Sequence, residues 1–113
     1  MDFEFIRGDT FRFKFKLLDA NKNILQLTSG DEIYFTVKTN YDKSNFELQK
    51  RFSKGEIVQE GDYYYITLSH SDTANLKYGN YVYDIELKSG ELVKTLITGN
   101  ITLSKEVTHI SNE

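Results

Sequence analysis

Apolar and basic residues alternate strictly from residue 11 to residue 17. The apolar positions are Phe11, Phe13, Phe15 and Leu17, and the positions between them are Arg12, Lys14 and Lys16. Successive side chains of a β-strand point to opposite faces, so one face of this segment is apolar and the other is basic. This pattern is typical of an antiparallel sheet that has one face in a core and the other in water.

The same two-residue period recurs in short segments separated by Gly, Asn and Asp, and predicts about seven to nine strands. The expected strands cover residues 2–6, 10–18, 24–27, 32–39, 46–52, 57–58, 63–69, 81–88 and 91–104. Within the last strand, Gly99 predicts a bulge or a bend. Residues 71–76 form the one helix-like segment, with Ser71 as the expected N-cap and Asp72 in the first turn.

Many short strands with regular turn signals favour a β-sandwich, and the helical turn before a strong strand favours a Greek-key crossover. We therefore predict an all-β, immunoglobulin-like antiparallel sandwich over residues 1–106, followed by a C-terminal tail over residues 107–113. Tyr81 lies just after the helical turn, where immunoglobulin-type sandwiches place a tyrosine whose hydroxyl bonds to the upstream backbone. We expect Tyr81 to form this tyrosine corner; the alternative is a plain core aromatic.

Composition narrows the classes of function. The 113 residues fit one domain, and their net charge of −3, from 14 basic and 17 acidic residues, argues against nucleic acid as the main partner. No cysteine is present, which excludes disulfides and thiolate metal sites. The first residues lack the pattern of a secretory signal, and no apolar run reaches the ~20 residues of a membrane span.

No catalytic or metal-binding constellation stands out. Ser69, His70 and Asp72 are sequence neighbours and are expected to form a polar turn, because a catalytic triad draws its groups from separate elements. With only His70 and His109 as histidines, a zinc site is not expected. The remaining candidates are weaker than their structural alternatives: an Arg7-Gly8-Asp9 adhesion tripeptide, acid–base pairs at Asp31/Glu32 and Asp84/Glu86, calcium loops at residues 19–23 and 60–62, and a glycosylation acceptor at Asn100–Thr102.

Two outward surfaces are candidates for binding. The basic residues Arg12, Lys14 and Lys16 either contact an acidic partner or, as we expect, are neutralised by a neighbouring strand that carries Asp84 and Glu86. Tyr34, Tyr63 and Tyr65 form one aromatic patch if their strands are neighbours in one sheet. We expect this patch to bind protein, with sugar stacking as the alternative.

The order of several short motifs resembles the immunoglobulin-like structural modules of phages and prophages, in particular the N-terminal domain of the baseplate upper protein of Gram-positive phages. The motifs are Gly8-Asp9-Thr10, Asp72-Thr73-Ala74-Asn75-Leu76, Gly79-Asn80-Tyr81-Val82-Tyr83-Asp84-Ile85-Glu86-Leu87, Ile97-Thr98-Gly99-Asn100-Ile101 and Val107-Thr108. Tyr78 departs from the family pattern, in which proline often precedes the glycine at position 79.

The resemblance implies a non-catalytic virion protein of the tail or baseplate, made in the bacterial cytoplasm without a signal peptide. It would need no cofactor or metal, and its partners would be other virion proteins or further copies of itself rather than nucleic acid or membrane. The alternative on the same fold is a carbohydrate-binding or host-surface adhesion module, because fold alone does not fix function.

Overall fold

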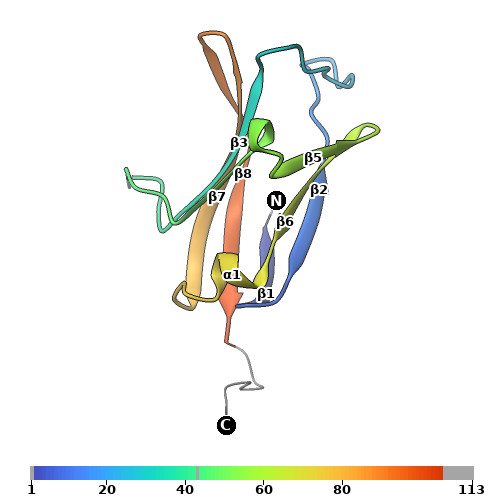
Figure 1. The fold of residues 1–113 in the computed structure, drawn as a ribbon. Helices are drawn as coiled ribbons and strands as arrows, with labels where there is room; N and C mark the ends of the chain where they lie inside the picture. Colours follow the sequence, from blue (N-terminus) through green and yellow to red (C-terminus); the bar gives the residue numbers. More distant parts are fainter. Residues whose placement is uncertain (1, 43, 106–113) are drawn as a thin grey trace.

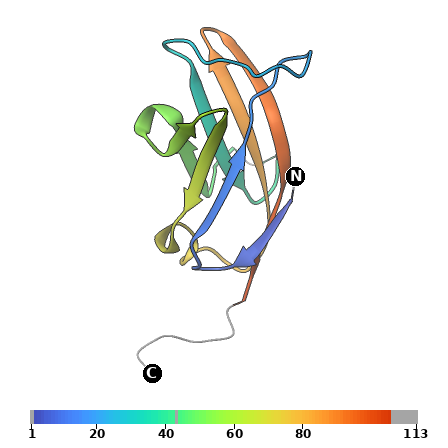
Figure 2. The same ribbon diagram turned by 90° about the vertical axis from the view of Figure 1, so that its right-hand side faces the viewer.

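The computed structural model describes residues 2–42 and 44–105, which form two packed β-sheets (Figure 1). The five-stranded sheet contains, in spatial order, β1 (Phe3–Ile6), β8 (Leu92–Ser104), β7 (Gly79–Ser89), β3 (Glu32–Lys38) and β4 (Leu48–Arg51). The three-stranded sheet contains β2 (Phe11–Phe15), β6 (Tyr63–Leu68) and β5 (Ile57–Glu60). Figure 2 shows the molecule turned so that the three-stranded sheet faces the viewer.

The topology is that of an immunoglobulin-like sandwich, as predicted. β2, β6 and β5 pair as strands B, E and D do, while β3, β7 and β8 pair as strands C, F and G do, with β4 as strand C′. The sandwich is not wholly antiparallel, since β1 runs parallel to β8 with Phe3 opposite Ile101. After β1 the chain turns at residues 7–10 and enters the opposite sheet as β2.

The core lies between the sheets and follows the predicted alternation. In β2 and just after it, Phe13, Phe15 and Leu17 are buried, while the intervening basic residues are exposed. The inward residues of β7 are buried as expected: Tyr81, Tyr83, Ile85 and Leu87. Aromatic rings link the sheets: the ring centroid of Phe35 lies 5.5 Å from that of Phe13 in the other sheet. It lies at the same distance from the ring centroid of Tyr83 in its own sheet.

The second and third predicted strands differ from the structure. The strand predicted over residues 10–18 ends at Phe15, which pairs with Tyr64. Because the strands are antiparallel and β6 begins at Tyr63, the chain after Phe15 has almost no β6 left to pair with. Residues 24–27 therefore have no ladder to join and form only one isolated bridge, between Leu18 and Ile24. The remaining predicted strands are present with shifted ends, and β4 lies at one edge of the five-stranded sheet.

The irregularity in β8 lies three residues before Gly99. Ile85 pairs with Ile97 and Glu86 pairs with Thr95, so Leu96 is the extra residue of the bulge. At Gly99 the ladder is regular, and the prediction of a bulge there was wrong. Gly99 lies opposite the buried Tyr83 of β7.

The short helix α1 (His70–Thr73) begins earlier than predicted. Ser69 rather than Ser71 is the N-cap, because the Asp72 carboxylate accepts the backbone N–H of Ser69 at 2.7 Å and closes a capping box. A single 3₁₀ turn, η1 (Phe52–Lys54), joins β4 to β5. The predicted tail and His109 lie outside the described residues.

Candidate functional site

The histidine-containing turn serves the fold. The His70 ring contacts the Gly8 carbonyl through Nδ1 at 2.7 Å, and because a carbonyl only accepts, Nδ1 carries the hydrogen. The neighbouring Ser69 and Asp72 side chains cap α1, as the sequence predicted for a polar turn. The three groups are therefore engaged in structural hydrogen bonds rather than arranged as nucleophile, base and orienting acid.

Asp72 also forms an ion pair that joins α1 to β4. Its carboxylate lies 2.9 Å from the ammonium of Lys50 on β4, and the two side chains are only 16% and 15% exposed. Burial by itself raises the pKa of Asp72, but hydrogen bonds from Ser69 and the hydrogen bond and charge of Lys50 outweigh it and lower the pKa.

The Arg7-Gly8-Asp9 tripeptide is docked against α1 and the turn after it. The Arg7 guanidinium donates to the Leu76 carbonyl at 3.1 Å and to the Tyr78 hydroxyl at 2.9 Å, and it lies over the Tyr78 ring. The Gly8 N–H donates to Oγ1 of Thr73 at 2.9 Å. An adhesion loop presents its arginine to a receptor, whereas this arginine is held by its own domain.

The first acidic pair is used for local hydrogen bonding. Asp31 accepts the backbone N–H and the hydroxyl of Thr28, and the backbone hydrogen bond is the main reason that its pKa is lowered. Glu32 is buried and accepts from the Ser53 backbone and hydroxyl and from the Arg51 guanidinium. Burial raises the pKa of Glu32, but these hydrogen bonds together outweigh burial and lower it.

Asp84 and Glu86 lie together on the outer face of the five-stranded sheet. Burial is the main cause that raises the pKa of Asp84, the charge of Glu86 adds to it, and Lys38 opposes it. Oδ1 of Asp84 is buried without a hydrogen-bond partner among the described residues. Because β7 and β2 belong to different sheets, Asp84 and Glu86 do not neutralise the basic residues of β2, and that prediction was wrong.

The two loops considered for calcium use their carboxylates elsewhere. Asp19 accepts the backbone N–H groups of Asn21 and Asn23, which closes the turn after β2. Glu60 lies 3.3 Å from the Arg12 guanidinium. Over residues 2–42 and 44–105, no group of three or more potential metal-ligating side chains was found.

The tyrosine corner is present. Tyr81, near the start of β7, is buried, and its hydroxyl donates to the Lys77 carbonyl at 2.7 Å. Burial, with the charge of Glu47, raises the pKa of this hydroxyl, so it remains protonated as a donor. The hydrogen bond fixes the turn between α1 and β7.

The three tyrosines considered for binding do not form one patch. Tyr34 lies on β3 in the five-stranded sheet, where the Arg51 guanidinium lies over its ring, 5.0 Å from the ring centre. Tyr63 and Tyr65 lie on β6 in the other sheet, with their rings 6.5 Å apart. The predicted combination of all three was therefore wrong, because their strands are not neighbours.

Tyr63 and Tyr65 instead share their face with the basic residues of β2, because β2 pairs with β6. The Arg12 guanidinium lies 4.1 Å from the centre of the Tyr65 ring. The ammonium groups of Lys14 and Lys16 lie 4.4 Å and 4.8 Å from the centre of the Tyr63 ring. We call the outer surface formed by these five residues the cation–aromatic face. The sequence pattern identified the basic residues and the tyrosines as outward-facing, but not that their strands pair.

The free part of β8 is a second candidate surface. β1 covers β8 only from Ile101 to Ser104, so within the described chain the segment 92–100 pairs with β7 alone. Leu92 and Val93, near the tip of the β7–β8 hairpin at the top of Figure 1, are 63% and 55% exposed. The bulge at Leu96 and the Asp2 carboxylate, which accepts the Asn100 N–H at 3.0 Å, interrupt this edge.

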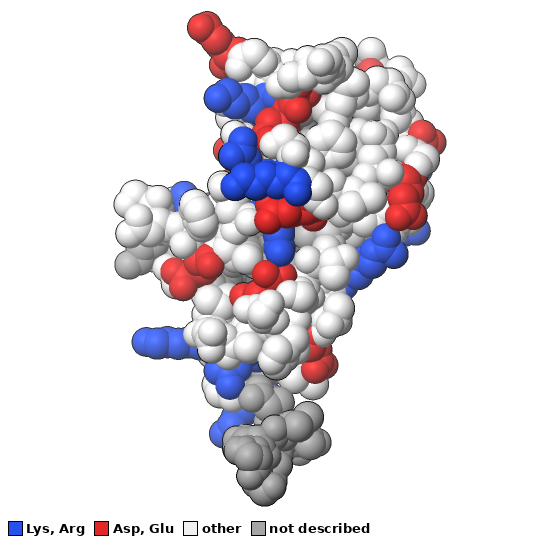
Figure 3. Space-filling model, in the orientation of Figure 1, with Lys and Arg blue, Asp and Glu red and all other residues white. Residues whose placement is uncertain are grey.

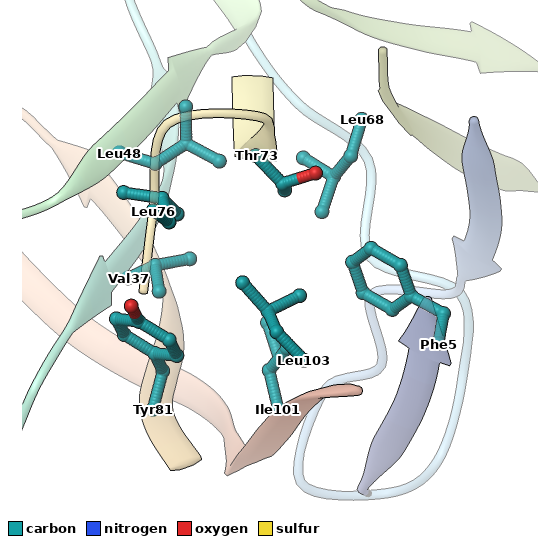
Figure 4. Close-up of a pocket in the computed structure, with 9 residues that line it drawn as sticks. All are labelled: Phe5, Val37, Leu48, Leu68, Thr73, Leu76, Tyr81, Ile101 and Leu103. Atoms are coloured by element: carbon teal, nitrogen blue, oxygen red, sulfur yellow. The ribbon is translucent and has the colours of Figure 1, made fainter. Parts of the chain in front are cut away.

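A small apolar cavity lies between the sheets near α1 (Figure 4). Its walls are Phe5, Val37, Leu48, Leu68, Thr73, Leu76, Tyr81, Ile101 and Leu103. Its volume of about 10 Å³ corresponds to a single water-sized sphere, far below a ligand pocket. On the outer surface, Figure 3 shows acidic and basic residues interspersed over the face in view.

Comparison with protein-family models and with curated proteins found no match for this chain. Among the described residues, no helix has the length and apolar character of a membrane span.

Proposed function

We propose that the chain is a non-catalytic structural module of a phage or prophage virion, associated with the tail or baseplate, that acts by protein–protein contact. The phage assignment is drawn from the motif resemblance. The structural role is supported by the observation that the motif residues hold one end of the sandwich together.

Motifs far apart in the sequence meet at this end. The Gly8 N–H of the first motif donates to the Thr73 hydroxyl of the second at 2.9 Å. Tyr81 of the third motif secures the turn that follows α1 through its bond to Lys77. These contacts make the motif residues part of a structural framework, which favours a module that presents its outer surfaces to partners.

The direct test is the protein composition of the particle. Phage particles from the bacterium that encodes this chain are purified on a density gradient and analysed by quantitative mass spectrometry. The proposal predicts that peptides of this chain persist through purification in a fixed ratio to tail proteins. If tail proteins are detected and this chain is not, the proposal is wrong.

Solution assembly gives a second measurement. Size-exclusion chromatography with light scattering, over a concentration series, reports whether the purified chain self-associates. A closed trimer or hexamer fits incorporation into a symmetric tail through its own surfaces. A monomer directs the search to a different virion protein.

The alternative, carbohydrate binding, is tested on a glycan array. The tyrosines that would stack on sugars carry cations over their rings, with Lys14 and Lys16 near Tyr63 and Arg12 near Tyr65. We therefore expect no saturable binding to neutral sugars. Saturable binding that is lost on Tyr63→Ser would favour the carbohydrate-binding function instead.

A further inference from the structure

We propose that the cation–aromatic face is a docking surface for an extended acidic segment of another virion protein. This inference rests on the proposed function and adds to it the surface used and the chemistry of the partner. Four features of the face carry it: its charge, the positioning of its cations, their spacing and the width of the sheet.

The face is positive although the chain as a whole is negative, with a net charge of −3. Arg12, Lys14 and Lys16 contribute three positive charges, and Glu60 offsets one of them through its contact with Arg12. No carboxylate of the described chain forms an ion pair with Lys14 or Lys16. A negatively charged partner supplies the missing counter-charge at this face.

The tyrosine rings hold the cations in place. Lys14 and Lys16 lie over one ring and Arg12 lies over the other, all with centroid distances below 5 Å. Each contact reduces the freedom of a long side chain before binding, so less conformational entropy is lost when a carboxylate pairs with it. Because the cations occupy the ring faces, the surface suits carboxylates better than the flat faces of sugars.

The spacing of the charges suits an extended segment. Lys14 lies on β2 and Lys16 just after it, and both ammonium groups lie over the Tyr63 ring. Two residues of an extended chain span about 7 Å between Cα atoms. An extended partner segment with an acidic residue at every second position presents carboxylates with the same repeat. The sheet has three strands, so its outer strands lie only about 10 Å apart, which is narrow for a broad protein surface and sufficient for one extended chain.

The first test uses a defined probe and the full purified chain. The probe is a fluorescein-labelled peptide in which glutamate alternates with threonine, and binding is followed by fluorescence anisotropy. The comparison peptide has glutamine in place of glutamate. We expect saturable binding of the acidic peptide that weakens as salt increases, and no binding of the glutamine peptide.

A matched pair of variants locates the binding. The double substitution Lys14→Glu with Lys16→Glu should weaken peptide binding by at least about tenfold. Lys88→Glu with Lys94→Glu changes the net charge equally on the exposed β7–β8 hairpin and should leave the affinity within about twofold of wild type. An equal loss in both variants, or none in the first, overturns the proposal.

A second pair of variants tests the role of the rings. Tyr63→Phe with Tyr65→Phe keeps both ring faces and should bind like the wild type, whereas Tyr63→Ser with Tyr65→Ser should weaken binding. Circular dichroism and urea unfolding establish that the serine variant is folded. If the serine variant is folded and binds like the wild type, the rings do not position the cations for binding.

Cross-linking identifies the partner in the particle. A carbodiimide activates a carboxyl group as its O-acylisourea, and the neutral amine of a lysine in contact with it then forms an amide and releases the urea. Mass spectrometry locates this product. We expect Lys14 or Lys16 joined to an acidic segment of another virion protein, and loss of this product in Lys14→Arg with Lys16→Arg. A product that joins two copies of this chain, or tighter binding of hyaluronate than of the peptide to the same lysines, overturns the stated partner.

The experiments distinguish a failure of the docking proposal from a failure of the proposed virion role. If the chain is present in particles but the acidic peptide does not bind, the docking surface is wrong and the virion role stands. If the peptide binds through Lys14 and Lys16 but the chain is absent from particles, the virion role is wrong.

Discussion

The hydroxyl of Tyr81 donates a 2.7 Å hydrogen bond to the carbonyl of Lys77, four residues upstream. This bond ties the first part of β7 to the turn after α1. A second buried tyrosine, Tyr64 on β6, has no such partner: its hydroxyl lies within the core, beyond hydrogen-bond reach of any described group.

Removing these two hydroxyls should have opposite effects on stability. Tyr81→Phe leaves the Lys77 carbonyl without its partner and should lower the free energy of unfolding by about 1–2 kcal/mol. Tyr64→Phe removes a hydroxyl that is desolvated without compensation and should be neutral or raise that free energy by about 1 kcal/mol. Urea unfolding of both variants at pH 7 measures the difference, and a loss of stability in Tyr64→Phe equal to that in Tyr81→Phe would contradict this assignment.

The partly buried pair of Lys50 and Asp72 should couple more strongly than the exposed pair of Arg12 and Glu60. The side chains of the first pair are 15% and 16% exposed, and those of the second are 52% and 58% exposed. Double-mutant cycles with Lys50→Met and Asp72→Asn, and with Arg12→Met and Glu60→Gln, isolate the two coupling energies. We expect about 1 kcal/mol or more for the first cycle and less than about 0.5 kcal/mol for the second.

The same carboxyl makes stability depend on pH. The pKa of Asp72 is lower in the folded protein than its usual value of 3.8, so its contribution is fully present above that value. As the pH falls through the folded pKa, Asp72 is protonated and the contribution is lost. The stability difference between wild type and Asp72→Asn should therefore be present at pH 7 and shrink progressively as the pH falls below 3.8. Urea unfolding across this range checks the trend, and a difference that grows on acidification would be inconsistent with it.

Gly8 should tolerate a side chain less well than Gly61. Both adopt positive φ angles, +87° and +64°, so alanine at either position costs about 1–2 kcal/mol of backbone strain. A Cβ at Gly8 would also lie 3.3 Å from Nδ1 of His70. A Cβ at Gly61 would have no atom of a non-neighbouring residue within 4 Å. We expect Gly8→Ala to be less stable than Gly61→Ala by about 1 kcal/mol in thermal or urea unfolding. Equal losses would show that the His70 ring moves away without cost.

Replacement of the buried Glu32 should lower stability strongly. Its carboxylate accepts from Arg51 and from both the backbone and the hydroxyl of Ser53, and glutamine can replace only part of this set. Glu32→Gln should lower the free energy of unfolding by about 2–3 kcal/mol. Glu91→Gln, on the exposed hairpin, is the control and should change it by less than about 0.5 kcal/mol.

The strand pattern was predictable because it depends on local geometry. The alternation around Lys14 follows from the pleat, so the sequence places Phe13 and Phe15 in the core and Lys14 and Lys16 outside without knowledge of any neighbour. The bond from Tyr81 to Lys77 spans four residues and is equally local. The N-cap at Ser69 rather than Ser71 is also a local feature, because the Asp72 carboxylate accepts the backbone N–H of Ser69, three residues upstream.

The binding surface required the tertiary structure. A two-residue period states which face a side chain takes but not which strand lies beside it, and so Tyr34 was grouped with Tyr63 although their strands occupy different sheets. For the same reason Lys14 was assigned an acidic neighbour such as Asp84, whereas β2 in fact pairs with the tyrosine-bearing β6. The sequence determined the faces through the fixed geometry of the strand; the folded chain alone decided which faces meet, because strand pairing joins residues more than 40 positions apart.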